Sequence, residues 1–439
     1  MRRVARLLSY GGCAVAVLLI SKFHARYVAD TPYDFTGSFR FTWAIGYIVV
    51  LAVATYAVGL PDQTRSRRQA LWLATLTTSA VQFALGDALL PRFVVFGSAL
   101  FLIPWQVAVA ALARDGRERD EDRDRVLLVA APAEHVRLEE DLHIFPERSA
   151  GLVATLTPEV AAGVEPGQQP IVEAQRASNA TVVVLDRFAQ AEDRVIAQAA
   201  TLHESGVRVR TLQSFYEEWL GKLPLSELER ASLFFDIGEI HRARYSRLKR
   251  VMDVVLATFG LVALVVVTPF VALGDLIANR GPLMYRQTRV GKGGEHFTIL
   301  KFRTMRELRA DDAHSDWTAE NDPRVTPFGN LLRRAHLDEL PQVINILKGD
   351  LAIVGPRPEQ PRYVDELSDK LPFYDLRHLV RPGLTGWAQV KYGYAGDERD
   401  ALEKLQYEFF YLRHQDLTFD QRIVLRTLRS MVGGQGVGR

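Results

Sequence analysis

The chain has 439 residues, of which 24% are charged and 48% hydrophobic, a composition typical of a globular protein with two or three domains. Its net charge of +2 says little, because the basic residues are clustered locally, but the lack of a basic face with aromatic residues and of a recognisable nucleic-acid-binding module argues against nucleic acid as a partner. The single cysteine, Cys13, excludes an intramolecular disulfide and a cysteine-based zinc site, and it fits soluble parts that face a reducing cytoplasm.

Four uncharged apolar runs lie near the N-terminus. They are residues 7–21, 41–61, 69–86 and 93–113. A transmembrane helix needs about 20 apolar residues, so the second and fourth runs are long enough, the third is at the short end, and the first needs Lys22 to reach the membrane surface. The alternatives are a signal peptide for the first run, after which no small-residue cleavage site follows, and a buried core helix for the third. We predict four transmembrane helices over residues 1–115.

Arginines cluster at alternate ends of these runs. They are Arg2, Arg3 and Arg6 before the first run, Arg65, Arg67 and Arg68 between the second and third, and Arg114, Arg117, Arg119 and Arg123 after the fourth. Because short segments rich in Lys and Arg stay in the cytoplasm, both ends of this four-helix unit are predicted to be cytoplasmic.

Residues 122–215 have the pattern of an α/β domain. Four short apolar segments are typical of strands, and helical patterns such as residues 192–204 lie between them. The segments are residues 126–130, 152–156, 181–186 and 207–210. This alternation predicts a parallel, Rossmann-like sheet. The turn after the first strand has no glycine, which disfavours close approach of a pyrophosphate, so we predict a structural or regulatory domain without nucleotide. Residues 216–246 are predicted to form a connector to the next part of the chain.

A fifth apolar run, residues 254–274, is also long enough to cross a membrane. It is interrupted by Thr268-Pro269, where the proline removes a helical hydrogen bond and favours a kink, and the Thr268 hydroxyl offers a bond to the freed carbonyl. Topology alone leaves two possibilities open, a fifth span or a re-entrant helix over residues 251–277. Just before this run, Lys249 and Arg250 are predicted to anchor the helix at anionic headgroups, and Asp253 to pair with a base.

Two adjacent carboxylates, Asp338 and Glu339, follow Arg333-Arg334 and precede a turn that contains Arg357. Arginines can hold a phosphate while one carboxylate attacks it. The pair is predicted to lie in a helix that runs to residue 348, where neighbouring side chains point about 100° apart, so the two acids should have different roles. An ordinary solvated pair is the alternative.

Residues 296–305 have the pattern of a strand, which would place Lys301 and Arg303 on one face. That face is predicted to contact a polyanion or, alternatively, only solvent. Residues 419–431 are amphipathic and would form a helix that lies on the membrane surface or packs in the protein.

The C-terminal half resembles the bacterial sugar transferases, which are monotopic polyprenyl-phosphate phosphoglycosyl transferases. The resemblance covers about residues 245–432 and is carried by an ordered set of motifs. These are Lys249-Arg250 with Asp253, Thr268-Pro269, Lys301-Phe302-Arg303-Thr304-Met305, Leu337-Asp338-Glu339-Leu340-Pro341-Gln342, Leu347-Lys348-Gly349-Asp350, Val354-Gly355-Pro356-Arg357-Pro358 and the segment from Val380-Arg381-Pro382-Gly383 to Val390. One departure is Thr-Pro at the helix break, where the family usually has Ser-Pro.

The resemblance implies a two-step reaction. Asp338 would attack the β-phosphate of a UDP-sugar and release UMP, and the phosphosugar would then pass to polyprenyl (undecaprenyl) phosphate. Glu339 would assist, and Mg²⁺ is expected at Asp338 and Glu339. The predicted phosphate contacts are Lys301, Arg303, Arg333, Arg334, Arg357 and Arg381.

The implied fold is a membrane protein with a four-helix transmembrane bundle, the Rossmann-like domain, and a mainly helical catalytic domain over residues 247–439. The implied location is the bacterial inner membrane, multi-pass, with the catalytic domain on the cytoplasmic side. A re-entrant helix, structurally defined by Lys249, Arg250, Asp253, Thr268 and Pro269, would keep the site at the inner headgroup level. The family's long form serves exopolysaccharide and O-antigen assembly, which implies glucose or galactose phosphate as the transferred group.

Two other functions fit parts of the sequence. One is an inactive membrane scaffold, although the acid pair and its basic neighbours are intact. The other is a glycosyltransferase that moves the sugar alone and releases UDP. The sequence leaves the oligomeric state open, a homodimer included.

Overall fold

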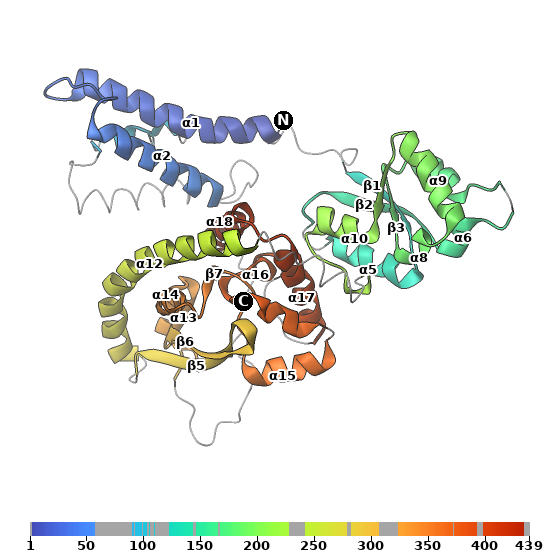
Figure 1. Cartoon of the computed structure of the whole chain (residues 1–439). Coiled ribbons are helices and arrows are strands. Elements are labelled where there is room, and N and C mark those ends of the chain that lie inside the picture. Colours follow the sequence, from blue (N-terminus) through green and yellow to red (C-terminus); the bar gives the residue numbers. More distant parts are fainter. Residues whose placement is uncertain are drawn as a thin grey trace. The chain divides into compact units, whose positions relative to one another are not determined.

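The computed structural model describes residues 2–57, 90–91, 93–98, 100–102, 105, 109, 123–143, 146–165, 167–227, 242–278, 282–306, 324–371, 373–392 and 398–433. The chain divides into two compact units. One comprises Met1–Glu118 with Val424–Gly436, and the other comprises Arg119–Ile423 with Val437–Arg439. Figure 1 shows the N-terminal helices of the first unit, and the parallel sheet and helical region of the second.

The first unit contains helix α1 (Arg2–Phe23), which continues as a π-helical turn (His24–Val28), and helix α2 (Phe39–Ala57). Buried side chains of both helices form one apolar core with described residues of the fourth apolar run. They include Cys13, Val17, Ala44, Leu51, Val94 and Leu102. The first run thus lies in a helix longer than the sequence predicts, because the helix begins before the run and extends past Lys22. The third run lies outside the described residues.

The second unit begins with a four-stranded parallel sheet in the order β2-β1-β3-β4. Its strands are β1 (Asp124–Val129), β2 (Ala150–Leu156), β3 (Val182–Leu185) and β4 (Arg208–Thr211). Alternate residues of β1 and β3 face opposite sides of the sheet. On one side they pack against α5 (Pro132–His143) and α10 (Leu212–Phe215), and on the other against α7 (Pro170–Ser178) and α9 (Asp193–Glu204). The predicted α/β domain with a parallel sheet is confirmed.

The side chain of Asp186, which follows β3, forms a hydrogen bond with the turn after β1. One of its carboxylate oxygens accepts the Ala131 amide at 2.8 Å, and the other accepts the Ala189 amide at 2.7 Å. The Asp186 side chain is buried. In sheets of this kind a ligand phosphate binds beside the carboxyl ends of the strands where the strand order reverses. A buried protein carboxylate at this point repels phosphate, which supports the prediction of a domain without nucleotide.

Helix α12 (Arg242–Ala278) is continuous for 37 residues and contains Pro269. It curves around α13 and α14 (Figure 1) rather than breaking into two segments. The Thr268 hydroxyl donates to the carbonyl of Leu264 at 2.6 Å. Proline at position 269 frees the carbonyl of Val265 instead, so Thr268 does not make the predicted bond.

One stripe of α12 packs on the protein, and the remaining surface is apolar and exposed. The buried stripe includes Asp253, Ala257, Leu264 and Val271, at the three- and four-residue spacings of one helix face. The exposed side chains include Phe259, Val262, Val265, Val266, Phe270 and Leu273. An apolar face of this size is typical of contact with lipid or another apolar surface.

Two helices among the described residues are long and apolar enough to cross a membrane, by length and composition. They are Leu7–Val28 and Tyr245–Leu276. The apolar stretches Phe39–Val53 and Phe93–Leu102 are shorter. The four-helix transmembrane bundle is therefore not confirmed.

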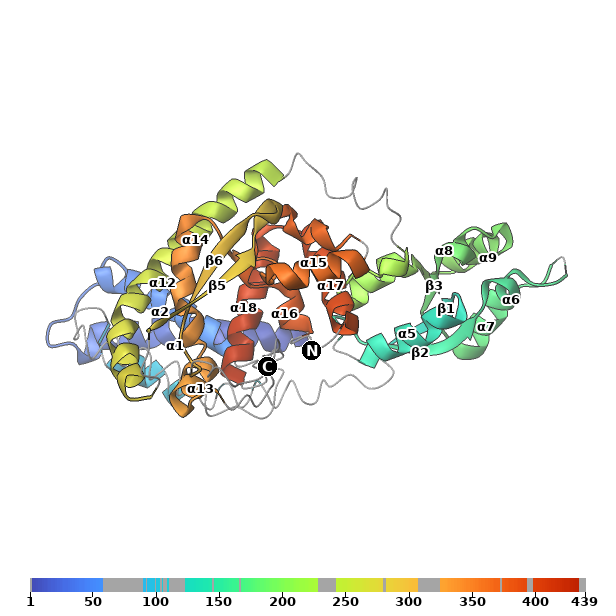
Figure 2. The same ribbon diagram turned by 90° about the horizontal axis from the view of Figure 1, so that it is seen from below.

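The rest of the second unit is mainly helical, as predicted, with two small sheets. Strands β5 (Met284–Val290) and β6 (His296–Phe302) form an antiparallel hairpin, and β7 (Ala352–Val354) pairs in parallel with β8 (Gly383–Thr385). The helices are α13 (Pro327–Arg334), α14 (Val343–Lys348), α15 (Pro361–Lys370), α16 (Trp387–Lys391), α17 (Glu398–Arg413) and α18 (Leu417–Gly433). Figure 2 shows the β5–β6 hairpin between α14 and α15. The start of α18, within the predicted amphipathic segment, is packed, since Phe419 and Ile423 are buried.

Candidate active site

The two adjacent acids lie in a short 3₁₀ helix, Leu337–Gln342, between α13 and α14. His336 begins this helix with a φ of 52°, a left-handed conformation that turns the chain sharply after α13. The predicted helix up to residue 348 is therefore present, but its first part is 3₁₀. With three residues per turn, neighbouring side chains diverge by about 120°, so Asp338 and Glu339 face different surroundings.

Glu339 is held by two cations. The ammonium of Lys301 donates to Glu339 Oε1 at 2.6 Å, and the Arg357 guanidinium lies 3.4 Å from the same oxygen. Burial by itself would raise the pKa of Glu339, but the charges of Lys301 and Arg357 more than offset it and lower this pKa to about 2. Glu339 is therefore ionised at physiological pH, and its negative charge is compensated by Lys301 and Arg357.

Asp338 has the opposite electrostatic character. Burial, followed by the charge of Glu339, raises the pKa of Asp338 above its ordinary value, against the opposing effects of Lys301 and Arg333. The described residues place no hydrogen bond or ion pair on its carboxylate. A carboxylate without a partner, beside one that is neutralised, is the one available to react.

Arg333 and Arg334 end α13, and they differ in their surroundings. The Nε of Arg333 donates to the buried hydroxyl oxygen of Thr304 at 2.9 Å, and the charge of Arg333 acts on Asp338. Arg334 is exposed, and none of the interactions described for the acid pair involves it. Of these two rivals, the structure brings Arg333 to the acid pair.

Arg303 and Arg381 are not brought to the acid pair by any described contact. Strand β6 ends at Phe302, so Arg303 lies beyond the strand, where its amide donates to the carbonyl of Leu283 at 3.0 Å. That amide bond continues the pairing of β5 with β6 by one residue, and the shared face of Lys301 and Arg303 stays a prediction. Arg381 lies just before β8 and is half-buried. Phosphate binding by these two arginines stays a prediction.

The residues predicted to organise the helix at the membrane make contacts inside the protein. Lys249 pairs with Asp420 at 2.7 Å. Arg250 donates to the carbonyls of Ile346 and Leu347, at 2.5 and 2.8 Å, and so caps the C-terminal end of α14. Their predicted contact with headgroups stays a prediction.

Asp253 accepts the amide of Ile353 in β7 at 3.0 Å. The predicted pairing of Asp253 with a base is present only as the charge interaction with Lys249 and Arg250, and its described hydrogen bond goes to the backbone. This contact ties α12 to the strand that leads into the Arg357 turn.

Sequence reasoning missed Asn345, which joins α14 to β6. Its side chain accepts the Leu300 amide at 3.1 Å and donates to the Thr298 carbonyl at 2.7 Å, and it is buried. These bonds fix the strand that carries Lys301 to the helix that follows Glu339. A lone asparagine within the apolar segment of residues 343–347 was the available signal, because buried amides are retained where they bond the backbone.

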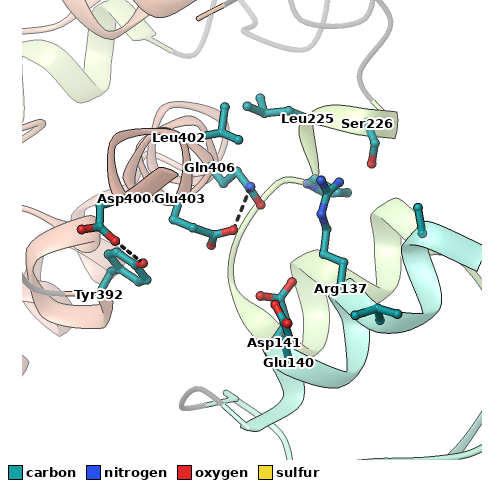
Figure 3. Close-up of a pocket in the computed structure, with 13 residues that line it drawn as sticks. Arg137, Glu140, Asp141, Leu225, Ser226, Tyr392, Asp400, Leu402, Glu403 and Gln406 are labelled. Atoms are coloured by element: carbon teal, nitrogen blue, oxygen red, sulfur yellow. Dashed lines mark hydrogen bonds between the residues drawn. The ribbon is translucent and has the colours of Figure 1, made fainter. Parts of the chain in front are cut away.

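A separate cavity lies elsewhere in the second unit. It has a volume of about 940 Å³ and lies between α5 and α17 (Figure 3). Its polar lining is mainly acidic, with Glu140, Asp141, Asp400 and Glu403 against one arginine, Arg137. Lys222 pairs with Asp141 at 2.6 Å and Glu403 at 2.8 Å, so no cation other than Arg137 in this lining faces a diphosphate, and neither residue of the acid pair lines this cavity. It is therefore not the candidate active site.

Known proteins resemble the region that contains this site. A family model described as "Bacterial sugar transferase" matches residues 244–434. A "UDP-N-acetylgalactosamine-undecaprenyl-phosphate N-acetylgalactosaminephosphotransferase" of Aeromonas hydrophila is 35% identical over 252 residues, which are 57% of this chain and 58% of that protein. A "UDP-glucose:undecaprenyl-phosphate glucose-1-phosphate transferase" of Escherichia coli (strain K12) is 43% identical over 185 residues, 41% of this chain and 39% of that protein.

A third relative is shorter. The "Exopolysaccharide production protein PSS" of Rhizobium leguminosarum bv. phaseoli is 35% identical over 195 residues, which are 43% of this chain but 98% of that protein. The chain thus spans about half the length of the first two relatives and nearly all of the third. Together with the family match, these similarities show that the chain belongs to the bacterial sugar transferase family.

Proposed function

We propose that this protein transfers a sugar 1-phosphate from a UDP-sugar to undecaprenyl phosphate and releases UMP. The relatives named for this reaction support the substrate classes. The observation that carries the proposal is the asymmetry of the acid pair. Glu339 is neutralised by Lys301 and Arg357, and the adjacent Asp338 carries a carboxylate without a described partner.

In the proposed first step, an oxygen of Asp338 attacks the β-phosphorus of the UDP-sugar. The bond between that phosphorus and the bridging oxygen breaks, UMP leaves with the bonding electrons, and the sugar phosphate stays on Asp338 as an acyl phosphate. In the second step, an oxygen of the polyprenyl phosphate attacks the same phosphorus, and the Asp338 carboxylate is released. Both steps are displacements at the same phosphorus, in which an ionised Asp338 is the nucleophile of the first step and the leaving group of the second.

The neighbouring groups have separate proposed roles. Arg333 and Arg357 contact the phosphates, and Lys301 joins them while it keeps Glu339 ionised. Glu339 holds Lys301 and Arg357 in place and assists proton transfer. Arg303, Arg334 and Arg381 are weaker candidates, because no described contact brings them to the acid pair.

Magnesium is the proposed cofactor. Mg²⁺ in such enzymes is held by one or two carboxylates, water and substrate phosphates, and it neutralises the diphosphate. The acid pair fits this limited requirement, although the described residues contain no group of three His, Cys, Asp or Glu side chains that could hold a metal alone. Of Asp338 and Glu339, the first fits better, because Lys301 already occupies an oxygen of the second.

The proposed location is the inner membrane, with the catalytic region cytoplasmic and α12 re-entrant. Contacts along α12 support this arrangement. Asp253 bonds β7, and Gly274, about 20 residues or roughly 30 Å further along the helix, faces the ring of Phe328 in α13. A spanning helix would separate these points by the whole hydrocarbon core of roughly 30 Å, and elements of the domain would have to lie within the bilayer. A role at the start of exopolysaccharide or O-antigen assembly completes the proposal.

The test is the identity of the released nucleotide. Membranes that contain the protein are incubated with Mg²⁺, undecaprenyl phosphate and, in turn, UDP-glucose, UDP-galactose and UDP-N-acetylgalactosamine. The proposal predicts UMP in equal amount to the lipid-linked product. UDP as the only nucleotide product would instead establish transfer of the sugar without its phosphate.

A further inference from the structure

We propose that the α/β domain positions Arg357 through Trp387, so that Trp387 is a positioning residue for the acid pair. Only the activity measurements that test this inference depend on the proposed function. The third relative shows that the family exists without the α/β domain, since 195 matched residues make up 98% of that protein. Any effect of this domain on the transferase region therefore has to pass through the contacts between them.

The α/β domain contacts Trp387 through the segment that follows β4. Tyr216, Trp219 and Leu220 pack in the core of this domain, so residues 216–221, which we predicted to be part of the connector, belong to it. The indole Nε1 donates to the carbonyl of Gly221 at 2.6 Å, and both the bond and the ring are buried. Gly221 has a φ of 71°, and a Cβ there would lie 3.0 Å from the indole ring. Glycine is thus needed at this position both for the backbone conformation and for the close approach.

Glu147 of the α/β domain fixes the surroundings of the same ring. It accepts Lys391 at 2.8 Å and Arg422 at 2.5 Å. Both cations lie over the Trp387 ring, at 5.5 and 5.8 Å from its centroid. The α/β domain therefore holds Trp387 from its N–H group and through the cations that cover it.

Trp387 is joined to the Arg357 turn by the segment just before it. The Gly355 amide donates to the Thr385 carbonyl at 2.9 Å, and the Gly383 amide donates to the Pro356 carbonyl at 2.8 Å. Gly386 lies so close to the Gly355 carbonyl that a side chain there would collide with it. The backbone of residues 383–386 therefore moves with the backbone of residues 355–356.

Arg357 follows directly and carries the effect to the acid pair. Its guanidinium lies 3.4 Å from Glu339, and its carbonyl accepts Arg377 at 2.9 Å. Arg377 is itself fixed by a buried pair with Glu408 at 2.8 Å. A shift of Trp387 would thus move the turn against a rigid support and change the reach of Arg357 toward Glu339.

The test compares Trp387→Phe with Trp219→Phe. The first variant loses the bond to Gly221 and keeps an aromatic ring. The second is a matched control, because buried Trp219 also donates one indole bond, to Asp124 at 2.9 Å, but within the α/β domain. Amide hydrogen exchange of full-length protein is measured by mass spectrometry over residues 353–359 and 383–387. We expect exchange there to be roughly fivefold faster in Trp387→Phe, the effect of one ordinary hydrogen bond, and unchanged in the control.

Activity gives a second readout. Trp387→Phe should lower kcat/KM for UMP release roughly fivefold, and this effect should vanish in an Arg357→Ala background, because both changes act on one group. Equal exchange in the two tryptophan variants, or a full fivefold effect that persists without Arg357, would overturn the inference. A wild-type protein that releases no UMP would contradict the proposed function, and the exchange comparison would still decide whether Trp387 holds the Arg357 turn.

Discussion

Replacing Lys301 by methionine removes the cation closest to Glu339, and the effect should appear in the pH dependence of turnover. In the wild-type protein the pKa of Glu339 is about 2, so this acid stays ionised over the whole useful range. Asp338, whose pKa is raised, is then the acid whose protonation ends activity as the pH falls. The acid limb should therefore follow a single group.

The size of the effect follows from the ion pair. The difference between the ordinary value of 4.5 and about 2 corresponds to roughly 3 kcal/mol in favour of the ionised form, and Lys301 is the largest favourable contributor. Because the folded-state pKa is lowered, this stabilisation is present above pH 4.5 and is lost as the pH falls toward 2. In Lys301→Met, burial is opposed mainly by Arg357, so we expect the pKa of Glu339 to return to 4.5 or above.

The assay is kcat/KM for UMP release between pH 4.5 and 8. In Lys301→Met we expect a rate at least tenfold lower at neutral pH and an acid limb that begins at higher pH and is steeper, because two acids now protonate. The control is Lys292→Met, which removes an exposed lysine from the turn of the same hairpin. An acid limb in Lys301→Met that coincides with that of the control would show that Lys301 does not control Glu339.

Three further predictions test the acid pair, its support and the topology. Asp338→Asn should abolish turnover and also the phosphosugar adduct, which is measured by intact-protein mass spectrometry. The control Asp375→Asn, at an exposed position, should retain both. An adduct on the Asp338→Asn protein would show that another residue is the nucleophile. Asn345→Leu should remove two hydrogen bonds to the backbone of β6 and lower the free energy of unfolding by about 1–3 kcal/mol, measured by thermal unfolding in detergent. An unchanged melting temperature would contradict this support. With Cys13 replaced by serine, a thiol at Lys292→Cys should react with a membrane-impermeant maleimide only in inside-out vesicles; labelling of intact spheroplasts would place the hairpin outside and refute the re-entrant helix.

The spacing of apolar residues and the positions of turn-forming residues predicted the α/β domain well. The two central strands, β1 and β3, are buried and appear in the sequence as short continuous apolar segments, and all four strands were predicted at nearly the observed bounds. The same reasoning could not reveal that Asp186 bonds the turn after β1, since the two lie about 55 residues apart and meet only when β1 and β3 pair. Long-range contacts of this kind leave no local pattern.

The sequence predicted which residues belong to the candidate site, but it predicted less well which of them contact one another. The motif placed Lys301, Glu339 and Arg357 among the candidates, but it could not show that the two cations share one oxygen of Glu339. The strand pattern could not show that β6 ends at Phe302, just before Arg303, because such a pattern does not fix the last residue of a strand. The contacts of Arg250 and Asp253 were assigned to the membrane or to a base, because sequence spacing does not distinguish a charged group that meets headgroups from one that caps a helix of its own domain.

These internal contacts connect the depth of α12 in the membrane with the geometry of the acid pair. Arg250 caps the end of α14, and Gly260 lies against Val343 at the start of α14, directly after the 3₁₀ helix of the two acids. Any displacement of α12 by the bilayer would thus act on both ends of α14. The acids would then move with the helix that meets the lipid, which keeps the proposed nucleophile at a fixed depth relative to the lipid phosphate. A change that uncouples them, such as a larger residue at Gly260, should therefore lower turnover on membrane-bound lipid more than it lowers binding of the soluble UDP-sugar.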